Sequence, residues 1–91
     1  MSFTIIFSSA YEKRATQFLN KHPELFESYA KTLNLLHENP QHPSLRLHAL
    51  KGRLQGLHSV SINMSYRITL ELIMTKKEII LVNIGSHDDV Y

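Results

Sequence analysis

A chain of 91 residues can build one modest hydrophobic core but not two. Hydrophobic residues make up 43% of it and charged residues 20%, which is typical of a globular protein rather than a disordered one. The absence of cysteine excludes disulfide bonds and thiolate metal sites. No apolar run approaches the roughly 18 residues of a membrane span, and no signal peptide pattern opens the chain. We expect one soluble, cytoplasmic domain over residues 1–91, with no membrane partner.

The net charge of +2 conceals an asymmetry between the two halves of the chain. In residues 1–40, four basic side chains balance four acidic ones. Residues 41–77 contain Glu71 as their only acid, against Arg46, Lys51, Arg53, Arg67, Lys76 and Lys77. A basic segment of this kind is typical of proteins that bind a polyanion, although a solvated basic face would look the same.

The first predicted elements are a strand and a helix. The β-branched and aromatic residues of 3–7 favour a strand. Ser9 with Glu12 three residues later matches a capping box, so we expect a helix from Ser9 to about Asn20. Pro23 then suits the first turn of a second helix, which Asn39-Pro40 should end. The two helices would form a hairpin.

After the turn at residues 41–43, the apolar period changes to two. Residues 59–64 and 66–72 alternate apolar and polar side chains, so both are predicted strands with one buried and one wet face. Residues 78–84 are apolar on both faces, which predicts a strand inside the sheet. The fold class is therefore α+β: an N-terminal strand, a helical hairpin, and an antiparallel meander packed on the helices. The other sheet face is expected to be polar and open.

Three features could carry chemistry, since no metal or phosphate-loop motif stands out. They are the basic stretch 45–56, Arg67 on the wet side of a strand, and the tail 84–91 with His87 and Tyr91. Each has a structural explanation as well: Lys51 and Arg53 as surface charge, Arg67 as a partner of Glu71, Tyr91 as a terminal residue that packs on the sheet, and His87 as a cap of the terminal turn. No single feature decides between the two explanations.

Together these residues suit the cleavage of RNA by its own 2′-hydroxyl. That reaction needs a base, a cation for the added negative charge, and an acid for the leaving 5′-oxygen. Histidine suits the proton steps, arginine the charge, and an aromatic ring can stack on a base. The predicted catalytic residues are His87, His48, Arg67 and Tyr91, with Lys51, Arg53 and Arg46 binding RNA, and no metal or cofactor is expected.

Short motifs, in this order, resemble the RelE/ParE toxin superfamily over essentially the whole chain. They are Leu50-Lys51-Gly52, Leu54-Gln55-Gly56, Ser59 with Ser61, Tyr66-Arg67-Ile68, Ile84-Gly85-Ser86-His87 and the closing Val90-Tyr91. His48-Ala49-Leu50-Lys51-Gly52 and Gly85-Ser86-His87 are most similar to the YafQ branch. The resemblance implies a toxin of a type II toxin-antitoxin system that cuts mRNA on the ribosome. Its partners would be a cognate antitoxin, mRNA and the ribosome.

Carried over by position, the resemblance makes His87 the general acid and His48 a catalytic or phosphate-orienting histidine. Arg67 would stabilise the transition-state charge, and Tyr91 would position the substrate. The chain departs from YafQ toxins where Ser61 replaces a histidine. It also departs at Ser65 and Tyr66, which replace an aspartate and a tryptophan. The general base is therefore unassigned, with His48 or Lys51 as candidates.

Two other functions remain open at this point. A ParE-like toxin on the same fold would poison DNA gyrase and would need no acid or base histidine. A degenerate toxin would only bind its antitoxin or RNA, which the serines at positions 61 and 65 favour. In every case a basic groove and a partly open sheet should attract an acidic helix or an added strand of the antitoxin.

Overall fold

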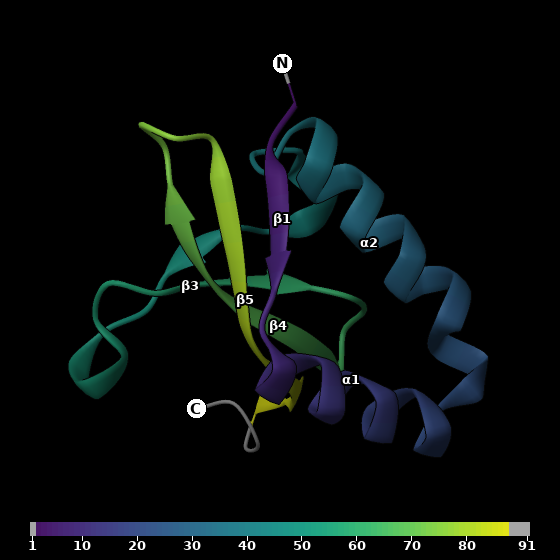
Figure 1. Cartoon of the computed structure of the whole chain (residues 1–91). Helices are drawn as coiled ribbons and strands as arrows, with labels where there is room; N and C mark the ends of the chain where they lie inside the picture. The colour runs from purple at the N-terminus through teal and green to yellow at the C-terminus, as the bar shows by residue number, and fades with distance from the viewer. Residues whose placement is uncertain (1, 88–91) are drawn as a thin grey trace.

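The computed structural model describes residues 2–87 and places two helices against a five-stranded sheet (Figure 1). Strand β1 (Thr4–Phe7) leads through helix α1 (Ser9–Lys21) and the short 3-10 helix η1 (Pro23–Leu25) to helix α2 (Phe26–Glu38). The second half contains η2 (Pro43–Leu45), β2 (His48–Ala49), η3 (Gly52–Leu54), β3 (His58–Ser61), β4 (Tyr66–Ile73) and β5 (Glu78–Ser86). The predicted α+β order is confirmed.

The strands lie in the order β1-β5-β4-β3-β2. Strands β3, β4 and β5 pair antiparallel, as the predicted meander requires, and β5 lies inside the sheet as expected. Strand β1 pairs parallel with β5, so the sheet is mixed. Strand β2 was not predicted, because two residues are too short to show an alternating pattern.

A bulge in β5 explains why three apolar residues at uneven spacing share the buried face. Thr69 pairs with Asn83 and Leu70 pairs with Leu81, so Val82 is an extra residue opposite that step. The added residue restores the alternation between the two halves of the strand. Ile79, Leu81 and Ile84 are all buried as a result.

Both helix starts differ from the sequence prediction. The N-cap of α1 is Ser8 and not Ser9, because the Ser8 hydroxyl accepts a hydrogen bond from the Tyr11 amide at 3.1 Å. The second helix begins with the tighter turn of η1 at Pro23, which changes the helical phase. Phe26, the first residue of α2, is consequently 61% exposed.

The predicted strand over residues 59–64 ends earlier, at Ser61. The side-chain oxygen of Asn63 accepts hydrogen bonds from the backbone amides of Ser65 and Tyr66 at 2.8 and 2.9 Å. An asparagine that bonds its own backbone in this way favours a turn over a strand. Met64, expected on the buried side, is 93% exposed in that turn.

Two tyrosines join the helices inside the core. The hydroxyls of Tyr11 in α1 and Tyr29 in α2 are 2.9 Å apart and buried. Burial raises the pKa of Tyr11, and the Tyr29 hydrogen bond raises it further. Burial also raises the pKa of Tyr29, against a smaller lowering by Tyr11. Each phenol therefore ionises more readily in the unfolded chain, so the pair's stabilisation is complete below pH 10.0 and declines as the pH rises above it.

We expect Tyr11→Phe to lower the free energy of unfolding by about 1–2 kcal/mol, because the Tyr29 hydroxyl then stays buried without its partner. Replacing both tyrosines should cost less than the sum of the two single changes. Urea unfolding of the two single variants and the double variant measures this coupling. Strictly additive losses would contradict it.

Candidate active site

The register of the strands defines two rows of side chains on the sheet face turned away from the helices. His48 of β2, Ser59 of β3 and Thr69 of β4 are successive cross-strand partners. Ser61 and Arg67 are partners in the next row along β3 and β4. Cross-strand partners point to the same side of a sheet. The chain's folding therefore places His48 and Arg67 on one face.

This polar face is less open than its sequence predicts. Ser59 is 0% exposed, Thr69 1% and Ser61 9%. The hydroxyl oxygens of Ser59 and Thr69 are buried and have no hydrogen-bond partner among the described residues. The prediction of a uniformly wet face is wrong here, because alternation reports which side a residue takes and not what covers that side. The side chains of this face that a ligand can reach lie beside these buried hydroxyl residues.

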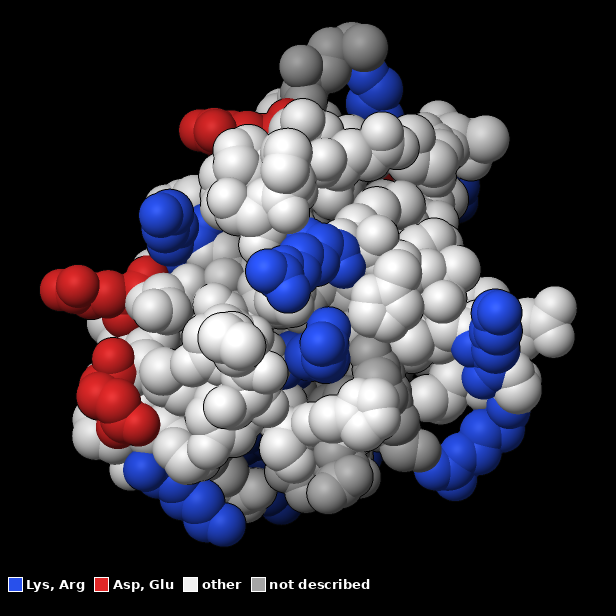
Figure 2. Space-filling model, turned by 180° about the vertical axis from the view of Figure 1, so that it is seen from behind, with Lys and Arg blue, Asp and Glu red and all other residues white. Residues whose placement is uncertain are grey.

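Arg46 and Arg67 line one hollow of about 360 Å³ on this face. Its other lining residues are Ser44, Ser61, Ile62, Asn63 and Met64. Arg67 is half-buried, and its Nη1 donates a hydrogen bond to the Ser61 hydroxyl at 3.3 Å. Figure 2 shows basic side chains near the middle of the molecule's rear face, with most acidic side chains at one margin. None of the residues lining the hollow is acidic, so it favours an anionic ligand.

The backbone of Arg46 is in the left-handed region, with φ 51° and ψ 46°. This conformation costs a residue with a Cβ about 1–2 kcal/mol. It ends η2 and directs the chain into β2. Strain of this kind is often retained at functional sites. The guanidinium of Arg46 thus enters the hollow from a turn for which glycine would be the more stable residue.

Arg46→Gly should separate stability from function. The change relieves the left-handed strain, so we expect the midpoint of thermal unfolding to stay or rise. Affinity for a polyanion, measured with single-stranded RNA, should fall because one of the two guanidinium groups in the hollow is lost. Thermal unfolding and RNA-binding titrations measure the two effects. A variant that loses stability together with affinity would contradict this assignment.

His48 is exposed, and its Nδ1 lies 3.2 Å from the backbone carbonyl oxygen of Arg46. A carbonyl can only accept, so Nδ1 carries the proton that it donates in this bond. In the neutral ring the lone pair is then on Nε2. The bond joins His48 to the same turn that presents Arg46. His48 does not itself line the hollow.

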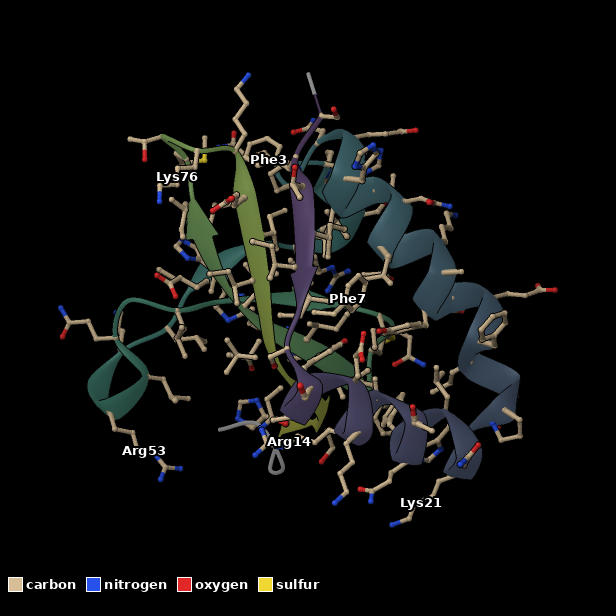
Figure 3. All side chains as sticks on the ribbon, viewed as in Figure 1. Phe3, Phe7, Arg14, Lys21, Arg53 and Lys76 are labelled. Atoms are coloured by element: carbon tan, nitrogen blue, oxygen red, sulfur yellow. The ribbon has the colours of Figure 1, made fainter. Side chains whose placement is uncertain are left out.

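His87 directly follows β5 and is exposed. Gly85, two residues earlier, pairs with Arg67, so β5 ends at the Arg67 end of the sheet. Lys51 and Arg53 belong to the loop around η3 and are exposed. Arg53 points away from the body of the molecule at the tip of that loop (Figure 3). Tyr91 lies outside the described residues.

The structure therefore brings Arg46 and Arg67 together and leaves Lys51 and Arg53 out of their hollow. Ser44, Asn63 and Met64 line it too, and sequence reasoning missed all three. Asn63 offered one signal, since asparagine is common in turns. Within residues 2–87, no three His, Cys, Asp or Glu side chains gather so as to hold a metal ion. No helix in that range is long and apolar enough to cross a membrane.

Comparison with known protein families finds no match to this chain, and comparison with curated proteins finds none either. Solved structures do match. The crystal structure of YafQ from E. coli strain BL21(DE3) has a TM-score of 0.80 and 15% identity, over 98% of both chains. The E. coli DinJ-YafQ toxin-antitoxin complex matches with a TM-score of 0.78 and 18% identity, over 100% of this chain and 99% of that one. The chain has the RelE/YafQ-like toxin fold.

The YoeB/ParE toxin from Agrobacterium tumefaciens shares this YafQ-like fold, with a TM-score of 0.73 and 11% identity over 93% of this chain and 99% of that one. The resemblance found in the sequence is thereby confirmed at the level of the fold. Identities this low establish the architecture, and the chemistry has to be argued from this chain's own residues.

Proposed function

We propose that this protein is the toxin of a toxin-antitoxin system and that it cleaves mRNA on the ribosome. One observation carries the proposal: Arg46 and Arg67 line a single hollow without acidic residues, on the polar sheet face of a YafQ-like fold. Two guanidinium groups in one hollow suit a phosphodiester, which each can contact through a planar fork of donors.

The reaction balances without a co-reactant. A base takes the proton of the 2′-hydroxyl, whose oxygen attacks the adjacent phosphorus. The bond from phosphorus to the 5′-oxygen breaks, and an acid protonates that oxygen, which leaves a 2′,3′-cyclic phosphate and a 5′-hydroxyl. Arg67, steadied by the Ser61 hydroxyl at 3.3 Å, would stabilise the charge that develops on the phosphoryl oxygens.

We assign the proton steps to the two histidines. His48 is the better candidate for the base, because its bond to the Arg46 carbonyl leaves the lone pair of the neutral ring on Nε2. Lys51 is a weaker candidate, since it lies on the η3 loop and does not line the hollow. His87 would be the acid, and Tyr91 would stack on a base of the substrate.

The proposed partner is a cognate antitoxin whose acidic segment covers the Arg46–Arg67 hollow. One structural neighbour is a toxin-antitoxin complex by name, the E. coli DinJ-YafQ complex, and another is the YoeB-YefM complex from Staphylococcus aureus. Translating ribosomes and mRNA place the proposed activity in the cytoplasm.

The proposal is tested by inducing the protein in cells and following protein and DNA synthesis with labelled precursors. We expect protein synthesis to stop first, and primer extension to reveal new mRNA ends inside translated reading frames. DNA synthesis stopping first, with gyrase trapped on DNA, would instead identify a gyrase poison. No new mRNA ends at any expression level would identify a non-catalytic antitoxin-binding protein.

A further inference from the structure

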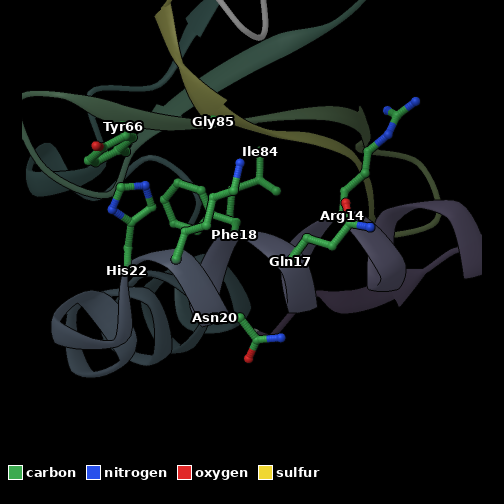
Figure 4. A pocket seen from close by; sticks show the side chains of 9 residues that line it. Arg14, Gln17, Phe18, Asn20, His22, Tyr66, Ile84 and Gly85 are labelled. Atoms are coloured by element: carbon green, nitrogen blue, oxygen red, sulfur yellow. The ribbon is translucent and has the colours of Figure 1, made fainter.

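A second, larger hollow of about 750 Å³ lies between α1 and the adjoining ends of β4 and β5 (Figure 4). Its lining residues are Arg14, Gln17, Phe18, Asn20, Lys21, His22, Tyr66, Ile84 and Gly85. In Figure 4 the rings of His22 and Tyr66 lie at one end and Arg14 at the other, with Gln17 between them. None of these residues belongs to the Arg46–Arg67 hollow.

Three rings form one end of this hollow. The ring centroids of Phe18 and Tyr66 are 5.1 Å apart in an edge-on arrangement, and those of His22 and Tyr66 are 4.7 Å apart. Phe18 is buried and fixes the group to the core, whereas His22 and Tyr66 are half-buried and keep some ring surface accessible. Accessible aromatic surface held in place at a hollow suits stacking on a nucleobase.

Cations and amides line the rest of it. Arg14 and Lys21 are exposed on α1, and no acidic side chain lines the hollow. Arg14 Nη1 donates to the Val82 carbonyl at 3.3 Å, which positions that guanidinium beside β5. The amides of Gln17 and Asn20 can both donate and accept hydrogen bonds, as the edges of a base require. Stacking surface, phosphate-binding cations and amides together match a nucleotide.

The two hollows lie on opposite sides of the same end of the sheet. Tyr66 and Arg67 are consecutive in β4, so their side chains point to opposite faces. Gly85 lines the larger hollow and pairs with Arg67 in the sheet. An RNA strand bound at Arg67 therefore needs to cross only this end of the sheet to reach Tyr66.

We propose that the Phe18–His22–Tyr66 hollow binds an unpaired nucleotide of the RNA strand, next to the segment that is cut at Arg67. The proposal rests on the proposed function, since it assumes that Arg67 faces the scissile phosphate. Base stacking on Tyr66 and phosphate contacts from Lys21 would add affinity and hold the strand in register across the sheet end.

The test uses a fluorescent single-stranded RNA about twelve nucleotides long, with every 2′-hydroxyl methylated so that it cannot be cut. Anisotropy titrations with the full chain then measure binding separately from cleavage. We expect Tyr66→Leu to weaken binding about tenfold, because stacking on the ring is lost. Lys21→Gln should weaken it about threefold and reduce the salt dependence of binding.

Two matched control variants accompany these substitutions. Tyr66→Phe retains the ring, and Lys13→Gln removes an exposed charge of α1 that does not line the hollow. Both should bind RNA within about twofold of the parent protein, because stacking and the lining cations are retained. Lys21→Gln alters only an exposed side chain, so it remains informative even if Tyr66→Leu fails to fold.

Unchanged RNA affinity in both Tyr66→Leu and Lys21→Gln would overturn the proposal. A parallel titration uses an acidic peptide that contains one tryptophan. If these variants lose the peptide and keep the RNA, the hollow is a protein-docking site and the proposal is also overturned. Failure of the proposed function looks different: the parent protein would then produce no new mRNA ends in cells, whatever happens to RNA binding at Tyr66.

Discussion

Replacing Arg67 with methionine should lower the rate of mRNA cleavage on translating ribosomes by at least about a hundredfold, the usual cost of removing a donor aimed at transition-state charge. Methionine keeps much of the side chain's length and apolar stem while removing every donor. Arg67→Lys retains the charge without the planar fork, so its rate should lie between those of the parent protein and Arg67→Met. Single-turnover cleavage on purified ribosomes measures the three rates.

The fold should survive this change. Arg67 is half-buried, and its Nη1 donates a hydrogen bond to the neutral hydroxyl of Ser61. It shares its hollow with the like charge of Arg46 and with no acidic residue. Removing the charge therefore relieves some repulsion, and the unfolding midpoint should not fall markedly. A lower rate combined with a collapsed midpoint would mean that Arg67 acts on structure.

Arg53→Met is the matched control for Arg67→Met. It removes the same kind of charge from the tip of the η3 loop, which points away from the body of the molecule. Its rate should fall only a few-fold, through weaker electrostatic attraction to RNA. Equal losses of cleavage rate in the Arg53 and Arg67 variants would mean that both residues act only through their positive charge. The assignment of Arg67 to the transition state would then be wrong.

The order of elements could be predicted because side-chain periodicity reports which face a residue takes. The period of two in residues 66–72 and the apolar run of 79–82 within the predicted strand 78–84 both correspond to observed strands. What the pattern could not show depends on single residues and tertiary packing. The Val82 bulge, the N-cap at Ser8 and the two-residue strand β2 are of that kind.

The candidate site was predictable by residue type more than by position. Arg67 was selected because its position in the strand pattern predicts the polar face, and the strand register confirms that Arg67 lies on that face. Arg46, Lys51 and Arg53 looked equivalent as cations of one basic stretch. A left-handed turn separates them, because it directs Arg46 into the hollow while Lys51 and Arg53 continue into the exposed η3 loop. The charge of a residue in the sequence does not show where its side chain lies in the fold.

His87→Ala should abolish growth arrest and lower the cleavage rate by at least about a hundredfold, because the 5′-oxygen then leaves without a proton. Binding of uncleavable RNA should change little, since proton donation matters only as the bond breaks. Loss of the acid can be told from loss of structure by changing the leaving group. In a substrate with sulfur in place of the bridging 5′-oxygen, the leaving group departs as a thiolate and needs no proton.

On that sulfur substrate, His87→Ala should recover most of the parent protein's rate. His48→Ala is the matched control: it removes an exposed histidine of the polar sheet face, which we assign to the first proton transfer. Its defect should persist with sulfur, because the 2′-hydroxyl must still lose its proton. Full toxicity of His87→Ala would remove it from the mechanism. Rescue of His48→Ala but not of His87→Ala would exchange the two roles, and it would place the acid on β2 beside Arg46 instead of at the end of β5.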